Sequence, residues 1–190
     1  MSFTAPEFRR ALARFATSVT VVTTVFEDKF YGLTVSAFCS VSLNPFLVLI
    51  SIEKTSQTHV MLHKSQVYAV NILTAQQQYL SERFARKDVE GGKTLADIKL
   101  HTAETGAPLF DEALAYLDCR VVAEYDGGDH TLFLGEVVNL YYNDQVDPAG
   151  QELPPLLYFR SHYCTTQELI GAGVQRTDSP LPGFEMPPPE

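Results

Sequence analysis

Apolar runs rich in β-branched and aromatic residues, separated by short polar turns, make up most of this chain. The first two runs cover residues 17–26 and 31–38, and the segment EDKF joins them. Valine, threonine and aromatic side chains favour extended strands, and two such runs joined by a tight turn predict a β-hairpin.

A longer hairpin is predicted further along the chain. The apolar runs 113–125 and 130–142 flank DGGD, whose residues favour a tight turn. The stretch around GAPLF, residues 106–110, is expected to be irregular. Single strands are expected over residues 46–52 after Asn44-Pro45, 66–73 with Val67, Ala69 and Asn71 on one face, and 154–163 after a proline pair.

An amphipathic helix is predicted at the start of the chain. Thr4 lies three residues before Glu7, which is the spacing of a capping box. Phe8, Leu12 and Phe15 then fall on one face of that helix.

Two short helices are predicted between the strands, over residues 56–65 and 75–87. Thr74 is a candidate N-cap for the second one, which should end near Gly91-Gly92. Because most strands are linked by tight turns, a mainly β fold is expected, an antiparallel barrel with short peripheral helices. We expect one domain over residues 1–170 and a proline-rich tail without regular structure over 171–190.

Composition narrows the class of function. The 190 residues are 45% hydrophobic and 19% charged, and the formal net charge is -9. That charge argues against nucleic acid or an anionic membrane as the partner, because both attract clustered lysine and arginine. No apolar run has the roughly 20 residues of a membrane span, and the N-terminus lacks a signal-peptide apolar block, so a cytoplasmic protein is expected.

The usual catalytic and metal-binding motifs are missing. Cys39, Cys119 and Cys164 are far apart without a CxxC pair, so reduced thiols in a core are expected rather than disulfides or zinc. His59 and His63 have a spacing compatible with a metal, but no third ligand accompanies them, and no metal site is expected. No GxSxG, GxxxxGK or HExxH motif occurs.

A run of hydroxyl side chains is the strongest candidate for a binding site. Thr34, Ser36, Ser40 and Ser42 share parity, so in an extended segment they would face one side. The alternative is an edge strand whose hydroxyls simply face solvent. A polar, uncharged wall suits a planar heterocycle with hydrogen-bonding ring atoms and a phosphate held without lysines.

Several segments in order resemble the flavin reductase-like family of small NAD(P)H:flavin oxidoreductases that serve two-component monooxygenases. They are GLTVSAFCSVSLNPFLVLISIEKTSQT, YAVNIL, LSERFA, GDHTLFLGEV and PLLYFR. The resemblance implies a homodimeric FMN-binding split β-barrel with FMN or FAD near the subunit interface. It also implies NADH or NADPH as hydride donor and a flavin-dependent monooxygenase as partner.

The resemblance also assigns residues to the expected site. The flavin ring would lie along Thr34, Val35, Ser36 and Ala37, with a second wall at Ser40, Val41 and Ser42. The ribityl phosphate region would include Ser51, Ser56 and Thr58, and the borders would include Asn71, Leu73, Ser81 and Phe84. His130 and Tyr158 would lie near the nicotinamide, with His130 as the candidate catalytic residue.

Two other functions stay open on the sequence alone. The protein could keep its flavin and reduce a metal or corrinoid centre, or it could bind flavin without turnover. Hydride transfer from nicotinamide to flavin needs no general base, which accounts for the missing catalytic motifs.

Overall fold

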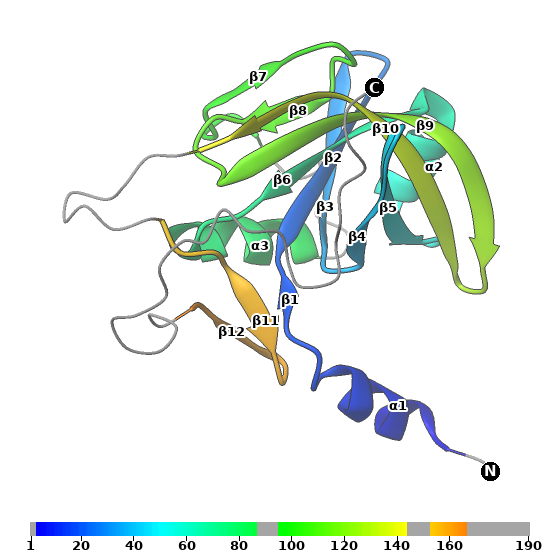
Figure 1. Ribbon diagram of the computed structural model, residues 1–190, viewed down its shortest axis with the longest axis vertical. Helices are drawn as coiled ribbons and strands as arrows, with labels where there is room; N and C mark the ends of the chain where they lie inside the picture. Colours follow the sequence, from blue (N-terminus) through cyan, green and yellow to red (C-terminus); the bar gives the residue numbers. More distant parts are fainter. Residues whose placement is uncertain (1–2, 87–94, 144–152, 167–190) are drawn as a thin grey trace, which may run out of the picture.

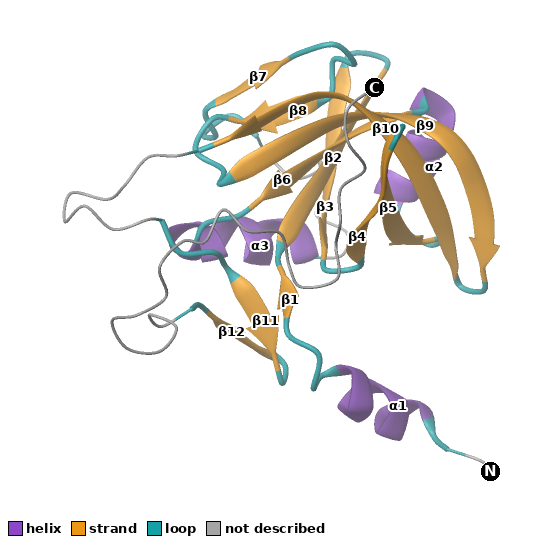
Figure 2. Ribbon diagram, viewed as in Figure 1, coloured by secondary structure: helices purple, strands orange, loops and turns teal. Residues whose placement is uncertain are grey.

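A computed structural model describes residues 3–86, 95–143 and 153–166 of the chain. One seven-stranded antiparallel sheet forms its body (Figure 1, Figure 2). In spatial order the strands are β3 (Lys29–Val35), β2 (Thr20–Phe26), β6 (Val67–Ile72), β9 (Ala115–Gly127), β10 (His130–Tyr142), β5 (Phe46–Glu53) and β4 (Phe38–Leu43). The expected mainly β antiparallel fold is confirmed.

The two edge strands, β3 and β4, follow one another in the chain, so the sheet must curl to bring its edges together. The link between these strands, Ser36-Ala37, turns back over β5, and the backbone N–H of Ser51 donates to the Ala37 carbonyl at 3.0 Å. This link therefore lies where the two halves of the barrel meet.

Two helices cover the β2–β3 hairpin, one on each face. From α2 (Gln57–Ser65), Leu62 enters the core that contains Val22, Tyr68 and Phe133. From α3 (Gln78–Ala85), Leu80 and Phe84 enter a second core beside Val21 and Phe110. Because β2 is covered on both faces, residues 20–24 are buried without the alternation of a half-exposed strand.

The predicted helix starts agree with the structure. The opening helix α1 (Ala5–Leu12) has the capping box between Thr4 and Glu7, and Ser56 caps α2. However, α1 projects from the body, and Phe8, Leu12 and Phe15 are exposed (Figure 1). The third predicted helix is a 3₁₀ turn, η1 (Ala75–Gln77), followed by α3, and the expected end at Gly91-Gly92 lies outside the described residues.

Three strand predictions need correction. The run 17–26 is divided into β1 (Thr17–Ser18) and β2, and the stretch expected to be irregular contains β8 (Pro108–Phe110), paired with β7 (Leu100–Thr102). The run 154–163 was predicted as one strand, but it contains β11 (Leu157–Phe159) and the start of β12 (His162–Cys164). The backbone reverses at Arg160 and Ser161, which both have positive φ, and neither is the glycine that usually signals such a turn.

The cysteines also differ from expectation. All three are free thiols, but only Cys119 is in the core, whereas Cys39 and Cys164 are exposed. Burial raises the pKa of Cys119 to about 12, so its thiol stays protonated. The expected tail 171–190 lies outside the described residues. Within the described ranges, no helix is long and apolar enough to cross a membrane.

Candidate functional site

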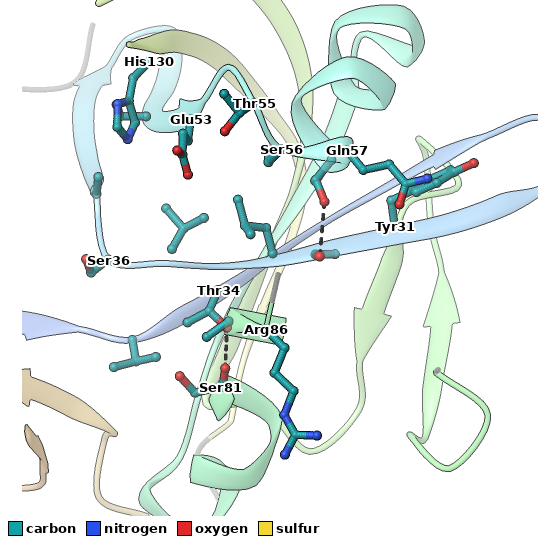
Figure 3. Close-up of a pocket in the computed structure, with 18 of the residues that line it drawn as sticks. Tyr31, Thr34, Ser36, Glu53, Thr55, Ser56, Gln57, Ser81, Arg86 and His130 are labelled. Carbon is teal, nitrogen blue, oxygen red and sulfur yellow. Dashed lines mark hydrogen bonds between the residues drawn. The ribbon is translucent and has the colours of Figure 1, made fainter. Parts of the chain in front are cut away.

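An open cleft of about 1490 Å³ lies beside the β3–β4 link. Single ligand sites commonly measure about 300–1,000 Å³, so this cleft has room for more than one ring system. Its walls come from β3, the link, the segment from β5 into α2, the end of α3, the start of β10 and the small β11–β12 sheet (Figure 3). The predicted site residues that line it are Thr34, Val35, Ser36, Ala37, Ser51, Ser56, Thr58, Ser81, His130 and Tyr158.

The first wall of the cleft consists of β3, α3 and the small β11–β12 sheet, and hydrogen bonds between these elements hold it together. The Thr34 hydroxyl donates to the Ser81 carbonyl at 2.6 Å, and the Ser81 hydroxyl pairs with the Tyr163 hydroxyl at 2.8 Å. Tyr163 in turn meets the Tyr158 ring edge to face, with 5.3 Å between centroids. These contacts join β3 to α3 and to the small sheet, so the wall is held together by the protein's own contacts. Because the Thr34 hydroxyl proton is used in the bond to Ser81, the Thr34 oxygen can only accept a hydrogen bond from a ligand.

The opposite wall carries hydroxyls around the start of α2. Ser56 Oγ accepts from the His59 backbone N–H at 3.1 Å, which leaves the Ser56 proton able to donate into the cleft. Thr58 Oγ1 donates to the Gly32 carbonyl at 3.2 Å and ties α2 to β3. Ser51 is half-buried on β5, next to the link that its backbone contacts.

His130 lies at one end of the cleft, and Figure 3 shows it on the same side as Glu53 and Thr55. Its Nδ1 is 2.6 Å from a carboxylate oxygen of Asp129, and this hydrogen bond holds the pKa of Asp129 below its ordinary value. An ionised carboxylate can only accept, so Nδ1 carries the proton and Nε2 is left to meet a ligand. The neutral ring can then accept from an amide at Nε2, and the protonated ring can donate.

Three predicted residues lie inside the protein rather than on the cleft. Asn71, Leu73 and Phe84 are fully buried. The Asn71 side chain bonds the strands around it, and the Phe84 ring packs directly beneath Gly32. Phe84 therefore supports β3 from behind, Leu73 packs in the same core as Phe84, and Asn71 joins β6 to β2 and β8.

The predicted second wall is also outside this cleft. Ser40, Val41 and Ser42 lie on the edge strand β4, where Ser42 Oγ accepts from the Asn44 backbone N–H at 3.1 Å. The expectation that four hydroxyls face one side is wrong, because β3 ends at Val35 and a register shift separates Ser40 from Ser42. A bulge of this kind reverses the face that the following side chains occupy.

Several lining residues were not predicted. Glu53 lies opposite His130 in the β5–β10 pairing, and Arg86 follows α3. Glu53 could have been predicted from strand register, because the antiparallel pairing of β5 with β10 fixes the residue that faces His130. The others with polar side chains are Lys29, Tyr31, Thr55, Gln57 and Tyr163.

The two histidines considered for a metal have other partners. His59 Nε2 is 2.8 Å from Thr131 Oγ1, and His63 Nδ1 is 2.7 Å from a Glu124 carboxylate oxygen. Across the residues that the structure describes, no group of three or more metal-ligating side chains is found.

Comparison with known proteins agrees with this architecture. Residues 12–167 match the model of the flavin reductase like domain. The reductase subunit HsaB of a Mycobacterium tuberculosis flavin-dependent monooxygenase is 36% identical over 156 residues, covering 82% of this chain and 79% of that protein. An NADH-dependent flavin reductase of Rhodococcus is 40% identical over 139 residues, covering 72% of this chain and 76% of that one.

A solved structure supports the same assignment. The flavin reductase PheA2 in its native state is 38% identical and superposes with a TM-score of 0.75, covering 87% of this chain and 100% of PheA2. The barrel, its peripheral helices and the order of the matching segments therefore all have one explanation: this chain belongs to the flavin reductase like family.

Proposed function

We propose that this protein is an NADH-dependent flavin reductase that releases reduced FMN or FAD to a separate monooxygenase. The observation that carries the proposal is the mostly uncharged, hydroxyl-lined cleft of a chain in this family. Relatives are named as NADH-dependent flavin reductases and as reductase components of monooxygenases. A flavin supplies the hydride acceptor at N5 and a nicotinamide dinucleotide supplies the hydride.

The donors of the cleft fit a flavin. Ser36 and the backbone of the β3–β4 link are placed to bond the polar edge of an isoalloxazine ring, while Val35 offers an apolar contact. Ser56 and Thr58 lie at the start of α2, where hydroxyls and backbone N–H groups suit a phosphate, and Ser51 lines the same cleft from β5. We propose that the ring lies along residues 34–37 and the phosphate lies toward α2.

The nicotinamide is assigned to the end with His130 and Tyr158. Both side chains line the cleft, and neither belongs to the proposed phosphate end. The work of the protein in this reaction is to hold two rings in contact and to exclude other geometries, and no general base is required. His130 can bond the carboxamide of the nicotinamide, or donate to charge that develops on the flavin.

We also propose that the protein is a homodimer. The edge strand β4 exposes the apolar side chains of Val41 and Leu43, and Phe46, the first residue of β5, is exposed opposite Leu43. An apolar edge of this kind is prone to pair with another chain unless it is covered. A second copy would cover this edge and would bring Ser40 and Ser42 against a neighbouring chain.

Turnover assays test the proposal directly. The purified protein should oxidise NADH when FMN or FAD is added, and a comparison with NADPH gives the preferred donor. Oxidation of NADH only in the presence of an added metal or corrinoid acceptor would favour a flavin-retaining reductase. Flavin binding with no NADH oxidation would show a binding protein without this activity.

A further inference from the structure

The turn that precedes His130 is joined to the end of β5 by the backbone and the side chain of one residue, Lys54. Lys54 follows β5 directly, and its backbone N–H donates to the Asp129 carbonyl at 3.0 Å. Its Nζ donates to the Gly128 carbonyl at 2.6 Å and forms an ion pair with Asp126. One residue outside the cleft thus contacts Gly128 and Asp129 of the β9–β10 turn and Asp126 near the end of β9.

These contacts add to the strand pairing beside the turn, in which His130 lies opposite Gly127 of β9 and Glu53 of β5. Gly128 has φ of +80°, and a Cβ added there would meet no atom within 4 Å. Asp126 and Asp129 are 80% and 89% exposed. The His130 side chain, 39% exposed, takes its direction from the Asp129 carboxylate, so any movement of the turn moves the ring.

We propose that Lys54 is a positioning residue for hydride transfer: it holds the turn 126–129, and through Asp129 it keeps the His130 ring at the end of the cleft. This inference rests on the proposed function, because it assigns Lys54 to the nicotinamide end of that reaction. Lys54 also neutralises one of the carboxylates near this end, which include Glu53, Asp126 and Asp129. An anionic dinucleotide approaches more readily when those charges are balanced.

The test compares Lys54→Met with Lys54→Arg in a stopped-flow reductive half-reaction. Lys54→Met should slow hydride transfer by roughly fivefold to a hundredfold, since small misplacement of a reacting partner has effects of that size. Lys54→Arg keeps the charge and donors and should recover most of the rate. Flavin affinity should stay within about twofold of the native value, because a small change away from the flavin contacts leaves ligand affinity nearly unaltered.

Two controls separate positioning from a general loss of structure or charge. Lys99→Met breaks an exposed ion pair with Glu112, whose N–O distance is 2.9 Å, away from the cleft, and should leave the rate unchanged. In a His130→Ala background, Lys54→Met should have little further effect, because the ring that it positions is gone. Equal slowing by Lys54→Met in both backgrounds, or no slowing in the native one, would overturn the proposal.

Hydrogen exchange gives a readout that does not depend on activity. Backbone amides of Gly127 to His130 should exchange faster in Lys54→Met than in the native protein, while those of β6 stay protected. Faster exchange together with inactive native protein would show that Lys54 holds the turn but that the proposed reaction is wrong. Unchanged exchange would reject Lys54 as the residue that holds the turn.

Discussion

Gly135 of β10 lies directly against the ring of Tyr68: a Cβ atom added at Gly135 would lie 2.6 Å from Cζ and 2.7 Å from Cε1 of that ring. Tyr68 is fully buried in the barrel core, where neighbouring side chains leave the ring no room to move aside. At Gly135, β10 therefore lies closer to the Tyr68 ring than a residue with a side chain would allow.

We expect Gly135→Ala to lower the free energy of unfolding by about 1–3 kcal/mol, the usual cost of overpacking a core. Urea unfolding followed by circular dichroism measures it. The Tyr68 hydroxyl oxygen is the atom nearest to the added Cβ, so the same substitution should cost less in a Tyr68→Phe background. Equal stability of Gly135→Ala and the native protein would mean that the barrel can widen at this point.

Flavin affinity should distinguish Ser36 from Ser42. Ser36 lines the cleft, whereas Ser42 lies on β4 outside it. Loss of one hydrogen bond to a bound flavin costs about 1–3 kcal/mol, or up to roughly a hundredfold in affinity. Titration by fluorescence should show this loss for Ser36→Ala and a change of under about threefold for Ser42→Ala. A similar loss for both would indicate that β4 reaches the flavin of a second copy.

His130→Ala should slow hydride transfer from NADH by roughly tenfold or more, with little change in flavin affinity, if one oriented hydrogen bond is lost. The measurement is the rate of flavin reduction after rapid mixing with NADH. An unchanged rate would leave His130 with only its bond to Asp129. A large loss of flavin affinity would instead place it against the flavin.

Stability should fall as the solution becomes acidic, in part because of His59. Burial lowers the pKa of His59 below its ordinary value, His63 and Lys54 lower it further, and Glu124 opposes them. The unfolded chain takes up this proton near pH 6.5, whereas the folded protein resists it, so protonation favours unfolding. The stabilisation is present above about pH 6.5 and is lost as the pH falls through the folded pKa.

We therefore expect His59→Gln to reduce the change in melting temperature between about pH 7 and pH 5. His162→Gln is the matched control, since His162 is exposed and bonds only the Arg160 carbonyl among the contacts that the structure describes. The same pH dependence in His59→Gln and the native protein would contradict this account.

The dimer prediction rests on the apolar edge at β4. Leu43→Glu should shift the protein toward monomer in sedimentation at micromolar concentration, because a charge would replace a 62% exposed leucine on the edge strand. Val60→Glu alters an apolar side chain of α2 that is 42% exposed, and it should leave the assembly unchanged. A native protein that sediments as a monomer with full activity would exclude the dimer as a requirement for the site.

Strong local patterns made most of the barrel predictable. The two hairpins have β-branched runs on both sides of a turn, and α1 and α2 have capping residues before them. A strand was predicted around β11, but not its end at Phe159 or its pairing with β1, because β1 is about 140 residues away and the position of Thr17 opposite Tyr158 leaves no local signal. The turn at Arg160-Ser161 has no glycine to mark it.

The residues that line the cleft could be predicted where they are consecutive in the chain. They could not be predicted where the direction of a side chain decides whether it reaches the cleft. Thr34 to Ala37 are consecutive in the wall of the cleft. Phe84 and Asn71 are buried and do not line the cleft, and only the three-dimensional packing decides which face of a strand or helix a ligand can reach. Lys54 was missed because its contacts come from a turn more than 70 residues later in the chain.

Asn71 has a consequence for how β6 aligns with its neighbours. Its Nδ2 donates to the Val21 carbonyl at 3.2 Å, and its Oδ1 accepts from the Phe110 backbone N–H at 2.8 Å. If β6 slipped by one residue, this amide would turn into the barrel core and lose both partners, and an unsatisfied buried amide costs about 1–3 kcal/mol. The valines around it would pay no such penalty, since apolar side chains pack in either alignment. One polar residue thus makes the native alignment of β6 the favoured one among several that hydrophobicity alone would permit.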